Sequence, residues 1–174
     1  YWKSIETCFQ IKDKQGKVVP FVLWKTQDKY MGNLIGHYGK ELQGVRDIIL
    51  KARKEGFSSL ILAMFAVDFL WEDYPVASVC IADKKDETKK LFDRAKFFID
   101  SAIRRKSNNE ATITDTCDVL NVNEIVNKRN GATFWIGTAG SRSFGRGDDI
   151  TDLHISEYAA QLAFDFCFVI FLLF

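Results

Sequence analysis

One stretch of the chain places residue types that bind phosphate in the order that a phosphate-binding loop requires. It reads Lys51-Ala52-Arg53-Lys54-Glu55-Gly56-Phe57-Ser58-Ser59 and lies between two apolar runs, Ile48–Leu50 and Leu60–Leu62. A strand, a short turn with a glycine and a cation, and a hydroxyl pair at the start of a helix are the parts of such a loop. The spacing differs from the common Walker A motif, because Phe57 stands where that motif has its lysine.

Each part of this loop has a chemical role in holding a triphosphate. Gly56 allows the tight turn whose backbone N–H groups cradle phosphate, and the hydroxyl of Ser58, with Ser59 beside it, can bind Mg²⁺. The cation for the phosphate oxygens is left open among Lys51, Arg53 and Lys54. Taken alone, the loop is more typical of an ordinary basic turn before a helix.

Two later segments carry charged residues suited to phosphoryl transfer. Glu157 follows Asp152–Ser156, and a carboxylate there can orient or deprotonate an attacking water; the plainer interpretation is a glutamate that starts a helix. The segment 138–149 is rich in Gly, Ser and Arg, and its Arg146 can reach a neighbouring subunit's site or remain a solvated loop charge. His154 is expected to be a packed histidine rather than a ligand.

The periodicity of apolar residues predicts strands that alternate with helices. Strands are expected at 47–51, 77–82, 132–137 and 153–156, and helices at 26–38, 58–71 and 86–105, after a hairpin at 9–23. The segment 112–130 is ambiguous, with short strand-like pieces. Strands joined by helices run parallel and bind ligands beyond their carboxyl ends. The sequence therefore predicts a three-layer α/β domain with a mainly parallel central sheet, in which Ser58 and Ser59 cap the second helix.

Composition indicates one globular domain and argues against a strongly basic nucleic-acid binder. The 174 residues are 47% apolar and 14% aromatic, and the formal net charge is +1. The four cysteines form no Cys-x-x-Cys pair, which argues against a zinc site and favours a reducing cytoplasm. We expect no signal peptide and no membrane span, because the apolar tail at 164–174 is shorter than the ~20 residues that a bilayer requires.

The succession of these segments is more specific than any one of them. The segments Leu23–Gln27, Lys51–Ser59, Ile81–Asp83, Gly137–Ala139 and Leu153–Glu157 follow one another. In this order the chain resembles, from about Phe9 to Tyr158, the ATPase domain of the large terminase subunit of tailed bacteriophages. The resemblance implies a P-loop NTPase-like fold and Mg²⁺-dependent ATP hydrolysis that drives double-stranded DNA into proheads.

The resemblance also implies roles for single residues. Gln27 matches the glutamine that reads adenine, Glu157 the catalytic carboxylate that closes Walker B, and Arg146 an arginine finger that acts on the neighbouring subunit. The deviant Walker A loop of the family is matched by Arg53, Gly56 and Ser58, with Ser58 on Mg²⁺.

Three departures from the family pattern bear on activity. Phe57 replaces the loop lysine, as it does in one branch of the family, so another cation of the loop must carry the charge. Lys54 and Glu55 form a charged pair where the family more often has glutamine and an apolar residue. Ser156 replaces the Walker B aspartate, which leaves Asp152 as a further candidate ligand for Mg²⁺.

The resemblance divides the chain into three parts and leaves two rival functions open. Residues 1–46 hold the hairpin and the adenine-motif helix, 47–160 the nucleotide-binding core, and 161–174 an apolar tail unlike the family's continuation. The family's nuclease domain is not expected in this chain. The implied partners are double-stranded DNA, the portal protein, the small terminase subunit and further copies in a ring, within the cytoplasm of the bacterial host. The rivals are a degenerate, non-catalytic terminase remnant and another helicase-like nucleic-acid translocase.

Overall fold

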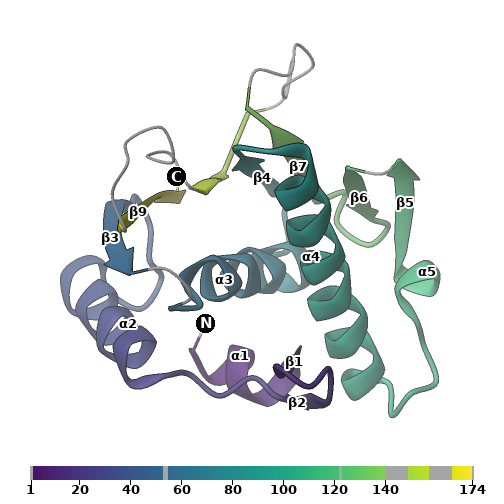
Figure 1. Cartoon of the computed structure of the whole chain (residues 1–174). Coiled ribbons are helices and arrows are strands. Elements are labelled where there is room, and N and C mark those ends of the chain that lie inside the picture. Colours follow the sequence, from purple (N-terminus) through teal and green to yellow (C-terminus); the bar gives the residue numbers. More distant parts are fainter. Residues whose placement is uncertain (1, 53–54, 122, 140–148, 157–165, 174) are drawn as a thin grey trace.

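Helices and strands alternate over residues 25–106, as the apolar periodicity predicts, whereas the last five described elements are all strands (Figure 1). The structure is a computed structural model, and it describes residues 2–52, 55–121, 123–139, 149–156 and 166–173. The helices are α1 (Trp2–Cys8), α2 (Lys25–Tyr38), α3 (Phe57–Trp71), α4 (Lys85–Lys106) and α5 (Ile113–Thr116). The strands are β1 (Gln10–Lys12), β2 (Val18–Pro20), β3 (Arg46–Ala52), β4 (Ala77–Ala82), β5 (Cys117–Asn121), β6 (Glu124–Asn127), β7 (Thr133–Thr138), β8 (Asp152–Ser156) and β9 (Phe166–Leu173).

The central sheet is mixed, with its parallel pairs at the middle. Seven strands lie in the order β3-β9-β8-β4-β7-β6-β5, while β1 and β2 form the separate hairpin expected at 9–23. β4 pairs in parallel with both β7 and β8. The other four pairs are antiparallel: short connections join β5 to β6 and β6 to β7, while β9 pairs both with β8 and with β3, which is distant in the sequence. The predicted parallel arrangement therefore holds at the centre of the sheet and not for the sheet as a whole.

One face of the sheet carries the helices. Phe134 of β7 contacts Phe65 and Phe69 of α3, and Thr138 on the same strand face hydrogen-bonds Thr88 of α4. The cross-strand register places Asp47 of β3 on that face too. The hydroxyl of Tyr30 in α2 donates to Asp47.

The opposite face is not covered by any helix among the described residues. On β3 the exposed fractions alternate, at 70% for Ile48, 8% for Ile49 and 58% for Leu50. On β7 the ring of Trp135 lies where a side chain at Gly137 would stand, so this glycine leaves room for the indole. The described part of the chain therefore has two layers, the sheet and the helices on one of its faces. The described residues do not include the third layer that the sequence predicts.

Helix α3 lies at the centre of the core. Twelve of its fifteen residues are buried, because apolar side chains occur on every side of the helix. The sheet covers one side, and α1 and α4 lie against others. Phe9, Phe21 and Phe98 form an aromatic cluster beside it. No helix in the described part of the chain has both the length and the apolar character needed to cross a membrane.

A polar turn fixes the carboxyl end of α3. Asn127, at the end of β6 and 1% exposed, donates from Nδ2 to the Phe69 carbonyl over 2.8 Å, and its Oδ1 accepts the Arg129 N–H. The Arg129 guanidinium donates to the carbonyls of Leu70 and Glu72. These donors satisfy carbonyl groups that a helix end leaves without an intrahelical partner.

We predict that Asn127→Ala lowers the free energy of unfolding by about 2 kcal/mol, because the Phe69 carbonyl loses its buried donor. Urea denaturation measures this change. Asn33→Ala is the matched control, since Asn33 lies exposed in α2 and alanine there favours the helix slightly. Equal stability of the two variants would contradict the role assigned to Asn127.

Candidate nucleotide-binding loop

The loop after β3 lies at the end of the sheet where the parallel strands have their carboxyl termini. β3 runs antiparallel to β9 and β9 antiparallel to β8, so β3 and β8 point the same way. Ile49 and Ser156 both pair with Val169 of β9, which places them at the same level. The carboxyl ends of β3, β4, β7 and β8 thus lie at the same end of the sheet. This is the position where ligands bind in α/β sheets.

Gly56 turns the chain from this end of the sheet into α3. Its backbone is left-handed, with φ 72° and ψ 9°, and it is the residue that caps the helix. The first helical hydrogen bond runs from Leu60 N–H to the Gly56 carbonyl, and among the described residues no side chain accepts from the first turn. The prediction that Ser58 and Ser59 cap this helix is therefore wrong, because both lie inside its first turn. The open N–H groups of the first turn and the helix dipole favour an anion.

Phe57 anchors the loop in the core. Its side chain is 7% exposed and meets the ring of Tyr30 edge-on, with 5.3 Å between ring centroids. The Tyr30 hydroxyl in turn donates to Asp47 Oδ2 over 3.1 Å. Burial and the Asp47 carboxylate raise the pKa of Tyr30 well above its ordinary value, so the phenol stays a donor. A buried phenylalanine cannot contact phosphate, so the side chain at this position secures the loop.

Gln27 binds the loop from the first turn of α2. It is 2% exposed, and its Nε2 donates to the Gly56 carbonyl over 3.0 Å and to the Glu55 carbonyl over 3.4 Å. Its Oε1 accepts the Trp24 N–H over 2.9 Å. The sequence indicated Gln27 only as an adenine contact and missed this second role. Glutamine three residues after a helix N-cap commonly reaches back to the N-cap N–H, so the sequence held a signal for the contact with Trp24 but none for the contact with Gly56.

Asp152 lies at the opposite end of β8 from the loop. Its carboxylate accepts the Ser78 hydroxyl over 2.6 Å and is repelled by the carboxylate of Glu72, just beyond the carboxyl end of α3. Ser58 lies at the other end of that 15-residue helix, about 22 Å long. The structure therefore does not bring Asp152 together with Ser58, and the proposed sharing of Mg²⁺ between them has no geometric support.

The remaining candidates divide between described and undescribed residues. Ser58 is half-buried in the first turn of α3, Ser59 is buried beside it, and Lys51 is half-buried near the end of β3. Four candidates lie outside the described residues: Arg53, Lys54, Arg146 and Glu157. Within the described ranges no cluster of three or more His, Cys, Asp or Glu side chains forms a metal site.

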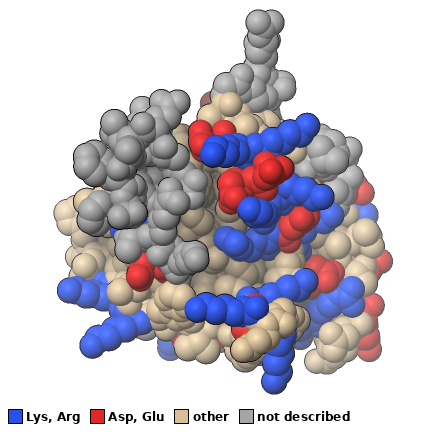
Figure 2. Space-filling view, in the orientation of Figure 1, with Lys and Arg blue, Asp and Glu red and all other residues tan. Residues whose placement is uncertain are grey.

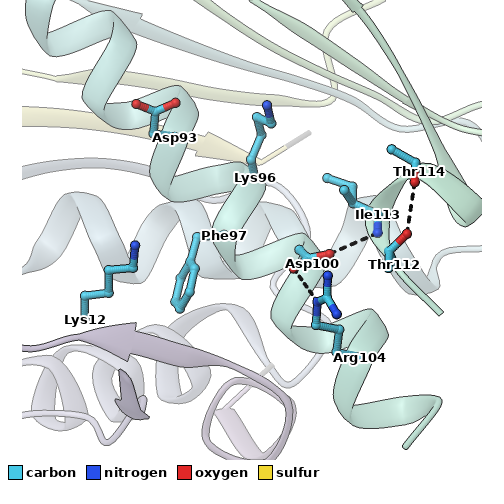
Figure 3. A pocket seen from close by; sticks show the side chains of 9 residues that line it. All are labelled: Lys12, Asp93, Lys96, Phe97, Asp100, Arg104, Thr112, Ile113 and Thr114. Atoms are coloured by element: carbon cyan, nitrogen blue, oxygen red, sulfur yellow. Dashed lines mark hydrogen bonds and ion pairs between the residues drawn. The ribbon is translucent and has the colours of Figure 1, made fainter. Parts of the chain in front are cut away.

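An open cavity of about 550 Å³ lies away from the loop, between β1, α4 and α5 (Figure 3). Two of its charged groups form an ion pair: Asp100 accepts from Arg104 Nε over 2.7 Å, and it also accepts from the Ile113 N–H over 3.0 Å. Lys12 lies over the ring of Phe97, 5.3 Å from its centroid. Asp100 and Arg104 are thus occupied by each other, whereas the first turn of α3 has open N–H groups, so we take the loop rather than this cavity as the candidate site.

We predict that Gly56→Ala destabilises the protein by more than Gly44→Ala does. Both glycines have positive φ, 72° and 69°, so each alanine costs about 1 kcal/mol in backbone strain. At Gly56 the added Cβ would also lie 2.7 Å from Gln27 Nε2, whereas at Gly44 it meets nothing within 4 Å. Displacing Gln27 adds about 1–2 kcal/mol.

A double-mutant cycle, measured by urea denaturation, separates these causes. In a Gln27→Ala background the side chain that obstructs the new Cβ is gone, so the excess cost of Gly56→Ala over Gly44→Ala should vanish. An excess that persists in that background would refute the contact as its cause.

We predict that Asp152→Asn stabilises the protein increasingly as the pH rises from 5 to 8. Burial raises the pKa of the Asp152 carboxyl to about 7, while the Ser78 hydrogen bond opposes the shift. A raised folded-state pKa means that this group's contribution is complete below about pH 4, the ordinary pKa of aspartate, and is lost as the pH rises through 7. Asparagine keeps the acceptor for Ser78 and carries no charge.

Thermal unfolding of the two proteins across this pH range measures the effect. The difference between their melting temperatures should grow by several degrees toward pH 8. A constant difference would mean that Asp152 is ionised in the fold throughout.

Comparisons with known proteins do not identify a relative of this chain. No protein-family model, curated protein or solved structure matches the chain. Function is therefore inferred from the chemistry of the residues themselves.

Proposed function

We propose that this chain is the ATP-binding and ATP-hydrolysing motor domain of a phage or prophage large terminase, with a P-loop NTPase-like core. The observation that carries the proposal is the contact between Gln27 and the left-handed Gly56 turn, at the open N-terminus of α3. It joins the two segments that a nucleotide would bridge, the adenine-motif helix and the phosphate loop. Both lie at the edge where the parallel strands end.

The first turn of α3 fits a phosphate group. Its N–H groups have no side-chain acceptor, and Gly56 allows the backbone to approach a ligand closely. In the proposed site these amides hold the phosphates, together with a cation from Lys51, Arg53 or Lys54. Ser58 offers its hydroxyl to Mg²⁺, which in nucleotide sites usually has few protein ligands besides the phosphates. Mg²⁺ neutralises charge that develops during phosphoryl transfer.

The amide of Gln27 serves both ends of the proposed site. Its Oε1 accepts one hydrogen bond from Trp24 and keeps a second lone pair, which can accept from the amino group of adenine once the side chains that bury Gln27 move aside. Its Nε2 holds the Gly56 turn. Binding of the base at Gln27 would therefore also brace the phosphate loop.

Turnover in this proposal depends on two residues outside the described part of the chain. Glu157 orients and deprotonates the attacking water. Arg146 reaches the site of the neighbouring subunit and stabilises the charge of the transferring phosphoryl group. Copies of the chain would act in a ring at the portal protein, with the small terminase subunit, in the cytoplasm of the bacterial host.

Coupling to double-stranded DNA would require local basic clusters, because the net charge is only +1. Figure 2 shows basic and acidic side chains interleaved on the visible face, without a broad region of one sign. Arg104, Arg105 and Lys106 form one basic cluster at the end of α4. Such a cluster offers phosphate contacts that position a duplex without reading its sequence.

A non-catalytic remnant is the second candidate, and Glu55 favours it. The Glu55 side chain lies in the phosphate loop and accepts the Thr26 hydroxyl over 3.3 Å. A carboxylate at this position would repel a triphosphate. The protein would then retain the fold and weak nucleotide binding without turnover.

We predict Mg²⁺-dependent ATP hydrolysis that falls at least tenfold in Arg53→Ala and at least a hundredfold in Glu157→Ala. The reason is loss of the phosphate cation in the first and of the water-activating carboxylate in the second. A coupled phosphate-release assay measures turnover, and fluorescent ATP titration measures binding. Lys89→Ala, which removes an exposed lysine of α4, is the control and should keep wild-type turnover.

Three outcomes decide between the candidates. Turnover that is the same in all four proteins would remove the enzymatic proposal. ATP binding without turnover in the wild type would establish the remnant. Activity that returns when Arg146→Ala and Glu157→Ala chains are mixed would support an arginine that acts between subunits, since one site of such a pair is intact.

A further inference from the structure

β3 is an edge strand with features that favour pairing with another strand. β9 pairs with one side of β3, and no strand within the described ranges pairs with the other (Figure 1). On the uncovered face Ile48 is 70% exposed and Leu50 58% exposed. Unpaired backbone groups beside exposed apolar side chains form a template for strand addition.

The sequence of β3 is complementary to itself in the antiparallel direction. Around a two-fold axis through Ile49, Ile48 lies opposite Leu50 of a second copy, and Asp47 lies opposite Lys51 of that copy. Paired residues point to the same face of a sheet. The apolar pairs would therefore gather on the uncovered face and the two ion pairs on the helix-bearing face.

Neighbouring registers lack this match. In a symmetric antiparallel pair, the two-fold axis must pass beside a residue that faces its own copy, and it cannot fall between two residues. An axis between two residues would pair each residue with its sequence neighbour, and those two side chains point to opposite faces of the sheet. An axis through Ile48 sets Asp47 opposite Ile49 of the second copy. An axis through Leu50 sets Lys51 opposite Ile49 of the second copy. Each places a charge against an apolar side chain. Only the axis through Ile49 pairs like with like on one face and opposite charges on the other.

Both charged side chains retain capacity for such a contact. Asp47 is half-buried and receives the Tyr30 hydroxyl at Oδ2, which leaves Oδ1 to accept from a lysine. Lys51 is half-buried on the same strand face.

We propose that two copies of this chain associate through antiparallel pairing of their β3 strands, centred on Ile49, to form one continuous sheet. The dimer is weak, because a seven-residue strand buries little area. It closes on itself by two-fold symmetry and so differs from the head-to-tail contacts of a ring. It requires neither ATP nor turnover, so it stands or falls independently of the proposed function.

Charge exchange tests this register by sedimentation velocity at rising concentration, without nucleotide. In a dimer of Asp47→Lys, lysine faces lysine across the strands at two places, and in a dimer of Lys51→Asp, aspartate faces aspartate at two places. Each variant should therefore dimerise at least tenfold more weakly than wild type. An equimolar mixture of the two variants should form a heterodimer, because every cross-strand pair is then of opposite charge. The variant carrying both substitutions should dimerise with itself.

This design separates misfolding from a failed interface. If Asp47→Lys disrupted the fold through Tyr30, the mixture and the double variant would also remain monomeric. Ile48→Lys with Leu50→Lys changes only exposed side chains and should likewise abolish the dimer while circular dichroism stays unchanged. A wild type that is monomeric at submillimolar concentration, a wild type that forms only larger rings, or a mixture that does not associate although both variants keep the circular dichroism of the wild type would each overturn the proposal.

Discussion

The burial of α3 is the constraint on which the rest of the structure depends. A helix with apolar side chains on every side must be enclosed, and the sheet, α1 and α4 enclose it. Its amino end then has to emerge at the sheet edge where β3 ends, and Gly56 is the residue that allows this turn. Its carboxyl end is closed by Asn127, Asn130 and Arg129, which donate to the last carbonyls. One end is thus saturated with donors, while the other presents unused N–H groups.

The sheet is covered on one face only by described elements. Trp135 partly compensates, since its indole covers Gly137 on the uncovered face. At β3 no side chain in the described chain covers this face, and Ile48 and Leu50 remain exposed. The same strand thus leads into the candidate phosphate loop at one end and offers an unpaired edge along its length.

Buried polar groups in this fold are balanced in two different ways. Gln27 and Asn127 use both ends of their amides for hydrogen bonds to the backbone, which fixes the turns that they contact. Asp152 is buried, so its charged form is costly and its pKa rises, and the hydrogen bond from the Ser78 hydroxyl offsets only part of that cost. The first two stabilise geometry at nearly any pH, whereas the third makes stability depend on pH.

The sequence by itself determined most of the elements: β4 lies at the expected 77–82, α2 within one residue of 26–38, and α3 within one residue of 58–71, whereas α1 was not indicated and 112–130 stayed ambiguous. Apolar periodicity and glycine breakers are local signals, so they could be read along the chain. It also indicated the loop, because strand, turn and helix follow each other there. Only the tertiary structure decided that β9 separates β3 from β8, that Gln27 holds Gly56, and that Asp152 lies at the far end of its strand from Ser58. Strand order and register arise from pairing between distant segments, and local periodicity does not encode which partners meet.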